Sequence, residues 1–253
     1  MRILFLGNNW LGWQVMKWLK ETGREIAGVV IHPEEKQKYA REILQAADLP
    51  PERIFFGQSL REASTLEAIR KLAPDVGLSV MFDYILDKAF LDLFPRGCFN
   101  LHPSYLPYNK GAFANVWAIV DRTPAGVTFH LIDEGVDTGP IVAQRRVEIE
   151  PVDTGETLYR KLERAGVELF KETWPRVEAC TFELRRQDPD EGEVHRRSDV
   201  ERIDRIDLDR EYKARDLIDI LRARTFPPYK GAYFEADGRK IYMELRLYED
   251  PEK

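Results

Sequence analysis

Three polar residues, Asn100, His102 and Asp137, carry the chemistry that the sequence suggests most directly. A neutral imidazole can accept a proton from an attacking amine, and an Asn amide can donate to an oxyanion. A nearby carboxylate can orient the imidazole, favour its charged form or hold a water molecule. Ser104 and Cys98 are close to these residues in the sequence, but neither is evidently paired with a base, so a covalent acyl-enzyme is not required. The set favours direct attack of a nucleophile on a bound acyl donor, with Asn100 and His102 stabilising the oxyanion.

Metal binding is an alternative function for the polar residues between 102 and 137. His102, His130, Asp133 and Asp137 would be the ligands, but their spacing follows no metal-binding motif. We therefore expect no metal. The histidines other than His102 lack comparable partners in the sequence and are expected to be structural or to lie at the surface: His32, His130 and His195.

Apolar runs that alternate with amphipathic stretches must position these groups. Buried strands are predicted at 2–6, 26–31, 54–56, 75–81 and 97–101, with helices at 11–20, 34–47 and 60–72. Strands alternating with helices predict an α/β fold, a doubly wound, mostly parallel sheet with helices on both faces. Residues two apart on a strand point the same way, so Asn100 and His102 should share one face.

The rest of the first 183 residues should complete this sheet. A helix is predicted at 113–120, strands at 127–132 and 141–149, an acidic loop at 133–140 and a long helix at 154–174. Thr154 lies near the start of the long helix, and Pro175 should end or kink it. Ser59 is the predicted N-cap of the 60–72 helix, and Glu62 would complete a capping box.

The composition changes after residue 183. The stretch 185–205 is rich in charge and poor in aliphatic residues, which predicts a linker or an exposed loop. Its charges are typical of a solvated face rather than of a binding tail.

A helix at 213–224 and a hairpin about Asp237-Gly238 form the predicted C-terminal appendage. An appendage of this size must dock on its neighbour or on a second chain to be stable, so it is a candidate dimerisation element. The predicted boundaries are 1–183 for a catalytic domain, 184–205 for a charged linker and 206–253 for the helix-plus-hairpin appendage.

The overall composition narrows the classes of protein. The chain has 253 residues and a net charge of -6, which argues against a general polyanion binder. Its two cysteines, Cys98 and Cys180, are too few for a disulfide framework and fit a reducing cytoplasm. No run approaches the roughly 18 to 20 apolar residues that span a membrane, so no membrane association is expected.

The segment 100–139 contains a series of short motifs in a fixed order. They are Asn100-Leu101-His102-Pro103-Ser104, Leu106-Pro107, Gly111, Gly126-Val127-Thr128, Asp133 and Asp137-Thr138-Gly139. This series resembles the signature of the 10-formyltetrahydrofolate-dependent formyltransferases. The resemblance implies a doubly wound fold, 10-formyltetrahydrofolate as co-substrate, and Asn100, His102 and Asp137 as the catalytic set. It also implies a binding site for the co-substrate, in which the backbone of one segment holds the pterin ring. The residues of this site would be Phe82, Asp83, Tyr84, Ile85 and Leu86, which form the segment, and Asp133.

Three other stretches look most like the sugar N-formyltransferases within this family: 6–12, 109–117 and 222–234. Those enzymes act on the amine of a nucleotide-linked amino sugar, often a dTDP-linked amino-dideoxyhexose, in glycan or lipopolysaccharide biosynthesis, and many are homodimers. Six residues in or near these stretches are the candidates for binding the acceptor: Asn8, Asn9 and Trp10 in the first loop, and Lys110, Asn115 and Tyr229, which are chosen from their position alone. A methionyl-tRNA formyltransferase-like enzyme and a formyl-folate hydrolase or binding relative remain the alternatives. The acidic chain makes nucleic acid the less expected partner.

Overall fold

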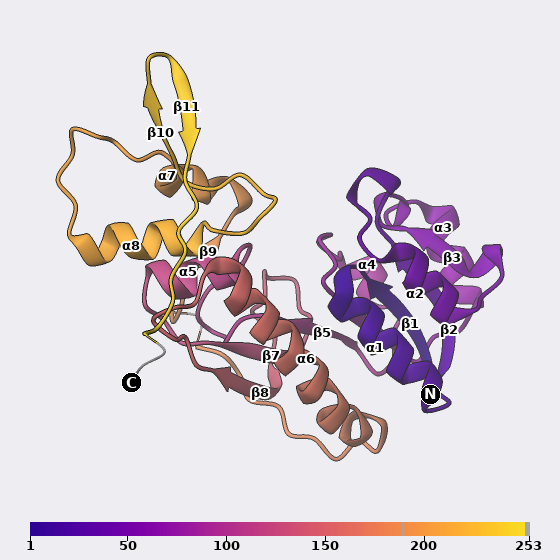
Figure 1. Ribbon diagram of the computed structural model, residues 1–253. Coiled ribbons are helices and arrows are strands. Elements are labelled where there is room, and N and C mark those ends of the chain that lie inside the picture. Colours follow the sequence, from indigo (N-terminus) through magenta and orange to yellow (C-terminus); the bar gives the residue numbers. More distant parts are fainter. Residues whose placement is uncertain (189, 251–253) are drawn as a thin grey trace.

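The computed structural model describes residues 1–188 and 190–250 (Figure 1). Residue 189, in the predicted linker, and residues 251–253, at the end of the predicted appendage, lie outside the described part. The strands are β1 (Arg2–Gly7), β2 (Glu25–Ile31), β3 (Ile54–Phe56), β4 (Val76–Val80), β5 (Cys98–His102), β6 (Lys110–Gly111), β7 (Ala125–Leu131), β8 (Ile141–Val147), β9 (Val194–His195), β10 (Tyr233–Ala236) and β11 (Arg239–Tyr242). The α-helices are α1 (Asn9–Glu21), α2 (Ala40–Ala47), α3 (Ala63–Lys71), α4 (Lys88–Leu91), α5 (Ala114–Val120), α6 (Gly155–Glu178), α7 (Glu201–Asp204) and α8 (Ala214–Ala223).

A central sheet of seven strands organises the chain, in the order β3-β2-β1-β4-β5-β7-β8. The first five strands of this order run parallel, and β7 and β8 are antiparallel to their neighbours. The predicted doubly wound, mostly parallel α/β fold is confirmed. The carboxyl ends of β1, β2, β4 and β5 therefore meet at one edge, where such folds place their ligands.

Alternation along the strands divides the core into two layers. Ile3 and Phe5 of β1 pack with α1, α2, α5 and α6 on one face, whereas Leu4 and Leu6 pack with α3 and α4 on the other. All four side chains are fully buried, as expected for a strand covered by helices on both sides. Cys98 of β5 belongs to the second layer, so Asn100 and His102, two and four residues on, lie on that same face.

Two predicted helices begin later than expected. The helix predicted from residue 34 is broken, because Tyr39 has a left-handed backbone (φ 58°) between the short 3-10 turn Glu34–Lys36 and α2. The helix predicted from residue 60 starts at Ala63. Ser59 is not its N-cap: its hydroxyl donates to the Phe56 carbonyl at 2.9 Å, and no side chain caps the first turn.

The long helix α6 continues past Pro175 to Glu178, so of the two predicted effects, an end or a kink, Pro175 does not produce an end. Trp174 and Val177, on either side of the proline, are almost completely buried in the core, and this packing outweighs the lost backbone hydrogen bond. The predicted start is confirmed. The Thr154 hydroxyl accepts from the Thr157 N–H at 3.3 Å and the Thr157 hydroxyl from the Thr154 N–H at 2.9 Å.

The charged segment after residue 183 contains short structured elements. Strand β9 pairs with β6, and a 3-10 turn (Arg197–Val200) leads into α7. Helix α8 packs against α5. The predicted hairpin is present, with Asp237 and Gly238 both at positive φ between β10 and β11, and it projects away from the sheet (Figure 1). Within the described residues, no helix is long and apolar enough to cross a membrane.

Candidate active site

The candidate site lies along β5 and the loops around its carboxyl end. Asn100 lies in the middle of β5 and His102 is its last residue. Val80, the last residue of β4, pairs with Leu101, so the loop after β4 starts beside the site. The loop between β7 and β8 begins at the other end of β5, where Leu131 pairs with Phe99, and then folds back over the strand.

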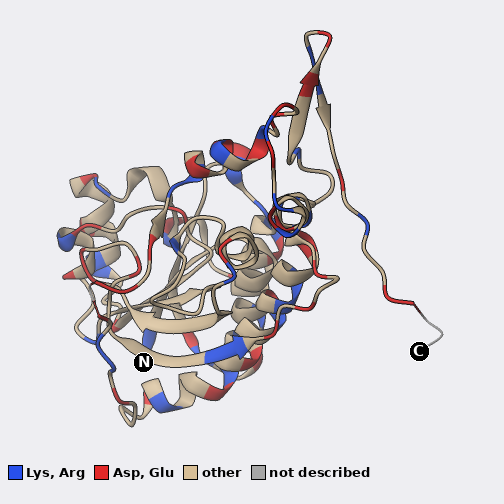
Figure 2. Cartoon of the chain, turned by 90° about the vertical axis from the view of Figure 1, so that its left-hand side faces the viewer, with Lys and Arg blue, Asp and Glu red and all other residues tan. Residues whose placement is uncertain are grey.

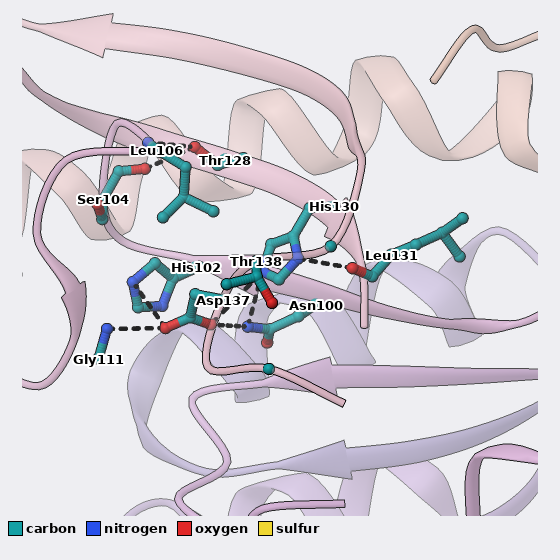
Figure 3. A network of polar contacts seen from close by, with 12 residues as sticks. Asn100, His102, Ser104, Leu106, Gly111, Thr128, His130, Leu131, Asp137 and Thr138 are labelled. Carbon is teal, nitrogen blue, oxygen red and sulfur yellow. Dashed lines mark hydrogen bonds and ion pairs between the residues drawn. The ribbon is translucent and has the colours of Figure 1, made fainter. Parts of the chain in front are cut away.

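The folded-back loop brings Asp137 onto both strand residues (Figure 3). Asn100 Nδ2 donates to Asp137 Oδ1 at 3.3 Å, and His102 Nε2 lies 3.4 Å from Asp137 Oδ2. The Gly111 N–H also donates to Oδ2, at 2.9 Å. The structure therefore brings together the three residues predicted to be catalytic, although Asp137 lies 35 or more positions downstream in the sequence.

His130 is a fourth member of this cluster, which sequence analysis assigned to a structural or surface position. Its Nδ1 lies 2.8 Å from the Leu131 carbonyl oxygen, and its Nε2 lies 3.2 Å from Asn100 Nδ2. A carbonyl oxygen only accepts, so Nδ1 carries the proton and Nε2 accepts from Asn100. The antiparallel register, which pairs His130 with Asn100, places it there. A polar alternation of Thr128 and His130 on the next strand was the signal available in the sequence.

Burial and charge set the protonation states of the cluster. Burial lowers the pKa of His102 below the usual imidazole value, and the Asp137 carboxylate only partly opposes this. Burial by itself would raise the pKa of Asp137, but His102, His130 and the Gly111 N–H together hold it below its usual range. At neutral pH the cluster thus combines a neutral imidazole with an ionised carboxylate. His102 Nε2 is buried and, among the described residues, has no hydrogen-bond partner.

Backbone strain gathers around the site. Met81 after β4, Asn109 before β6, Phe113 before α5 and Asp137 itself all have φ between 53° and 59°, in the left-handed region that side chains disfavour. Such conformations persist only where the surrounding structure holds them, and they concentrate at functional sites. Four of them around one cluster mark this end of the sheet as the functional one.

The residues predicted to bind the co-substrate lie in two loops. Phe82 and Tyr84 pack over the His32 ring, with ring centroids 4.9 and 5.5 Å from it. Leu86 is buried and Ile85 is 70% exposed, beside a cavity of about 390 Å³. The lining of this cavity includes Gly57, Leu60, Arg61, Asp83, Tyr84, Ile85, Leu86 and Phe90.

Asp133 shapes the loop that carries Asp137. Its Oδ1 accepts from the Gly135 N–H at 3.1 Å and from the Thr138 hydroxyl at 2.6 Å. Ile132, next to it, packs on the same apolar layer as Phe82. The two predicted co-substrate loops therefore border one apolar layer.

Three of the residues predicted to bind the acceptor are buried and make internal contacts. Lys110 Nζ donates to the Glu191 carbonyl at 2.9 Å, and Asn115 Nδ2 donates to the Gly155 carbonyl at 2.8 Å. Asn8 Nδ2 donates to the Lys36 carbonyl at 3.1 Å and its Oδ1 accepts from the Lys38 N–H at 2.7 Å. These side chains hold segments of the fold together, and their polar groups do not reach the catalytic cluster.

The other three predicted acceptor residues are less buried. Asn9 Nδ2 donates to the Tyr159 hydroxyl at 2.9 Å, while its buried Oδ1 has no partner among the described residues. Trp10 is partly buried against the core. Tyr229 is 53% exposed, and its hydroxyl accepts from Lys38 Nζ at 2.9 Å.

The metal alternative finds no cluster of ligands. Among residues 1–188 and 190–250, no group of three or more His, Cys, Asp and Glu side chains is arranged to hold a metal ion. Asp133, which that alternative required, contacts Gly135 and Thr138. The groups that converge on Asp137 are instead an amide, two imidazoles and a backbone N–H, a set suited to proton transfer and to stabilising developing charge.

The α/β fold and the buried Asn–His–Asp cluster are together suited to an enzyme of acyl transfer. The family model described as formyl transferase matches residues 1–173, and a model described as N-formyltransferase dimerization C-terminal domain matches residues 199–249. The chain belongs to the formyl transferase family and is a formyltransferase.

Two curated relatives represent two branches of this family. A methionyl-tRNA formyltransferase of Agathobacter rectalis is 30% identical over 246 residues, which cover 94% of this chain and 77% of that protein. A dTDP-4-amino-4,6-dideoxyglucose formyltransferase of Mycobacterium bovis is 34% identical over 157 residues, which cover 62% of this chain and 66% of that protein.

Solved structures share the fold over almost the whole chain. A 4-N formyltransferase from Francisella tularensis is 27% identical, with a TM-score of 0.83 and coverage of 98% of both chains. The formyltransferase PseJ from Anoxybacillus kamchatkensis was solved with UDP-4,6-dideoxy-4-formamido-L-AltNAc and tetrahydrofolate. It is 29% identical, with a TM-score of 0.57 over 80% of this chain and 89% of that one.

Proposed function

We propose that the protein transfers a formyl group from 10-formyltetrahydrofolate to the amine of a nucleotide-linked amino sugar. The proposed acceptor is a dTDP-4-amino-4,6-dideoxyhexose. The observation that carries this proposal is a neutral His102 whose Nε2 lies 3.4 Å from an ionised Asp137 and has no hydrogen-bond partner in the described part of the chain. An amine nucleophile needs such a base, because it must lose a proton as it bonds to the formyl carbon.

Each member of the cluster has one task in this scheme. His102 Nε2 takes the proton of the attacking amine, and Asp137 stabilises the imidazolium that results. Asn100 Nδ2 donates to the formyl oxygen as negative charge develops there. Its contacts with Asp137 and His130 are 3.3 and 3.2 Å, near the long limit for N–H bonds, so an oxyanion can replace one of them at little cost. His102 then returns the proton to the departing folate nitrogen.

The folate co-substrate would lie against the loop 82–86 and the loop of Asp133. Both loops border one apolar layer next to the cluster, and that layer suits a flat pterin ring. The tetrahydrofolate bound by PseJ, a relative of 29% identity, supports a folate donor here. The co-substrate supplies an activated formyl group, and the protein supplies the base and the donor.

The C-terminal part favours a sugar acceptor over a tRNA. Residues 199–249 match the dimerization domain of N-formyltransferases. Lys and Arg are interspersed with Asp and Glu over the chain in Figure 2, and the net charge is -6, whereas a tRNA-binding surface requires a continuous basic area. The F. tularensis relative is described as a 4-N formyltransferase. The A. kamchatkensis relative was solved with a UDP-linked 4-formamido sugar, and the M. bovis relative is described as a dTDP-4-amino-4,6-dideoxyglucose formyltransferase.

A second candidate acceptor is a charged initiator tRNA. One observation favours it: the 30% identity with the A. rectalis methionyl-tRNA formyltransferase extends over 94% of this chain. The two acceptors should differ in how their binding depends on salt. Binding of a tRNA should weaken steeply as ionic strength rises, because its phosphate contacts release counterions.

One assay decides between these acceptors. Purified protein would be supplied with 10-formyltetrahydrofolate and, in parallel, dTDP-linked 4-amino and 3-amino sugars, UDP-linked and GDP-linked amino sugars, and methionyl initiator tRNA. We expect formylation of a dTDP-linked 4-amino sugar with little dependence on salt. Formylation of the tRNA alone would establish the second candidate, and release of free formate without any acceptor would establish a hydrolase.

We further propose a homodimer formed through the C-terminal hairpin, and acceptor contacts from Asn9, Trp10 and Tyr229. Tyr229 has the most accessible of these side chains, at 53% exposure. The cytoplasmic location and a place in glycan or lipopolysaccharide biosynthesis stay predictions.

A further inference from the structure

We propose that His32 is a positioning residue that fixes the loop 82–86 in the shape that receives the folate, and that Arg197 is the second anchor of this loop. The inference rests on the proposed role of that loop in folate binding. His32 belongs to neither the catalytic cluster nor the residues predicted to contact substrate, and sequence analysis assigned it to a structural or surface position.

The strand order explains how His32 reaches this loop. It directly follows β2, and β2, β1 and β4 are consecutive neighbours whose carboxyl ends lie at the same edge of the sheet. His32 spans the end of β1 and meets the loop that follows β4. Its side chain is fully buried, and its Nε2 accepts from the Asp83 N–H at 3.1 Å.

The loop needs such an anchor because its entry is strained. Met81, the residue before the loop, has φ 56°, a conformation that a side chain of this size disfavours. Phe82 and Tyr84 pack against each other at 5.2 Å and against the His32 ring at 4.9 and 5.5 Å. Three successive loop residues, 82, 83 and 84, therefore contact a single imidazole.

Asp83 is held from two directions. Its backbone N–H donates to His32 Nε2 at 3.1 Å, and its carboxylate pairs with the Arg197 guanidinium at 2.5 Å. Arg197 starts the 3-10 turn that precedes α7, so it ties the loop to the C-terminal part of the chain. The same guanidinium lies 6.0 Å from the centre of the Phe113 ring, just before α5.

The unsatisfied nitrogen of His32 indicates a purpose beyond filling space. With Nε2 acting as acceptor, Nδ1 carries the proton, yet this buried Nδ1 has no hydrogen-bond partner among the described residues. An apolar side chain would fill the same volume without that cost. Burial lowers the pKa of His32, Asp83 opposes this, and Lys36 and Arg197 act in the same direction as burial, so Nε2 stays free to accept.

His32 differs from an ordinary core side chain because its Nε2 accepts a hydrogen bond from the Asp83 backbone N–H. Loss of the acceptor would free the Asp83 N–H and let the loop sample other shapes. Folate would then bind more weakly, because part of its binding free energy would be spent on ordering the loop. The chemical step at saturation would be unaffected, since Asn100, His102 and Asp137 keep their geometry.

The test compares His32→Leu, which removes the acceptor, with His32→Gln, whose amide oxygen can reach the place of Nε2. The measurements are the Kd of the unreactive 5-formyltetrahydrofolate by calorimetry, and kcat and KM for each substrate. We expect His32→Leu to raise the folate Kd and KM about tenfold, with kcat and the acceptor KM within twofold of wild type. His32→Gln should recover most of the loss, and Arg197→Met should raise the folate Kd by a smaller factor.

Several results would overturn the inference. A folded His32→Leu protein with an unchanged folate Kd would do so, as would loss of kcat at an unchanged Kd. If His32→Leu does not fold, Arg197→Met is compared with wild type, because the Arg197–Asp83 pair is exposed and its loss should not unfold the protein. An unchanged folate Kd in Arg197→Met contradicts the role of Arg197 as the second anchor. Calorimetry needs no acceptor, so wild-type protein that binds folate but formylates no sugar refutes the proposed acceptor alone. Wild-type protein that binds no folate refutes both proposals.

Discussion

Asp137 Oδ2 lies 3.4 Å from His102 Nε2, and the Gly111 backbone N–H donates to the same oxygen at 2.9 Å. The other carboxylate oxygen faces Asn100. One side chain thus contacts both the proposed base and the proposed oxyanion donor (Figure 3). Because its φ of 53° is unfavourable for a side chain, the loop must hold Asp137 in position.

Replacement of the base should abolish most of the activity. His102→Asn removes the imidazole that accepts the amine proton, and general-base catalysis typically contributes about 10²- to 10⁴-fold. We expect kcat to fall by a factor in that range, measured by formylation of the acceptor under saturating conditions. His195→Asn is the matched control, since the His195 side chain is also buried but its ring stacks on Trp117, while its contact with Gly111 is made by the backbone. Near-full turnover by a folded His102→Asn protein would contradict the assignment.

Replacement of the oxyanion donor should affect the rate more than binding. Asn100→Ala removes the Nδ2 donor, and loss of one such donor typically lowers kcat about 10²- to 10³-fold. Asn100→Asp should be worse, because it also places a second carboxylate against Asp137, 3.3 Å from the present amide nitrogen. The measurement is kcat and KM for both substrates. A rise in KM at an unchanged kcat would show that Asn100 only binds substrate.

Acid should switch the enzyme off at a lower pH than the usual value for histidine. Burial lowers the pKa of His102 from 6.5, and only the neutral imidazole can act as base. Activity should therefore be full at neutral pH and be lost as pH falls below 6.5 through this lowered pKa. Asp137→Asn removes the charge that favours imidazolium, so the midpoint should fall further.

An NMR titration of the histidine ring protons separates this ionisation from that of the acceptor amine. The resonance missing from His102→Asn identifies His102. A midpoint at or above 6.5 for that resonance would contradict the prediction.

The sequence predicted the sheet well because each strand shows its burial directly. Apolar runs such as 26–31 correspond to strands covered on both faces, and the period of two placed Asn100 and His102 on one face. The helix starts were less predictable. The break at Tyr39 depends on Asn8, which is distant in sequence and contacts Lys36 and Lys38 through its side chain. No local pattern reports such a contact.

The site was only partly predictable, because it also depends on contacts between residues that are distant in the sequence. Asp137 was identified by resemblance, while its position over β5 depends on how its loop folds back. His130 was missed because its role depends on the antiparallel register with Asn100, and a single polar residue on a strand does not reveal its partner. Lys110 was placed at the acceptor from its position alone, and the structure shows its charge buried against the Glu191 carbonyl.

Gly111, whose N–H donates to Asp137, should be irreplaceable. Gly111 has φ 82°, and a Cβ there would lie 2.4 Å from the His195 carbonyl oxygen. Gly111→Ala should therefore combine a conformational cost of about 1 to 2 kcal/mol with a clash that separates β6 from β9. Gly23 is the matched control, with φ 76° and open space around it, so Gly23→Ala carries the conformational cost alone.

Urea unfolding of the two variants separates the clash from the conformational cost. We also expect kcat to fall only in Gly111→Ala, since its N–H would leave Asp137. Equal destabilisation of the two proteins, with equal kcat, would show that the contact between β6 and β9 is dispensable.

The projecting hairpin should join two copies of the chain. A two-stranded hairpin is at best marginally stable alone, yet Ile241 and Tyr242 on β11 are 39% and 42% exposed. Ile241→Glu with Tyr242→Glu should convert the proposed dimer to a monomer in sedimentation experiments. Tyr248→Glu, which alters an exposed aromatic residue outside the hairpin, should not.

The monomeric variant should remain active, because every group of the catalytic cluster comes from one chain and none lies on the hairpin. Its kcat should stay within about twofold of wild type at saturating substrate, measured at the protein concentration that gives monomer by sedimentation. A monomer with kcat lost and the cluster intact would show that the partner chain completes the site. A protein that is monomeric without any substitution would refute the proposed dimer itself.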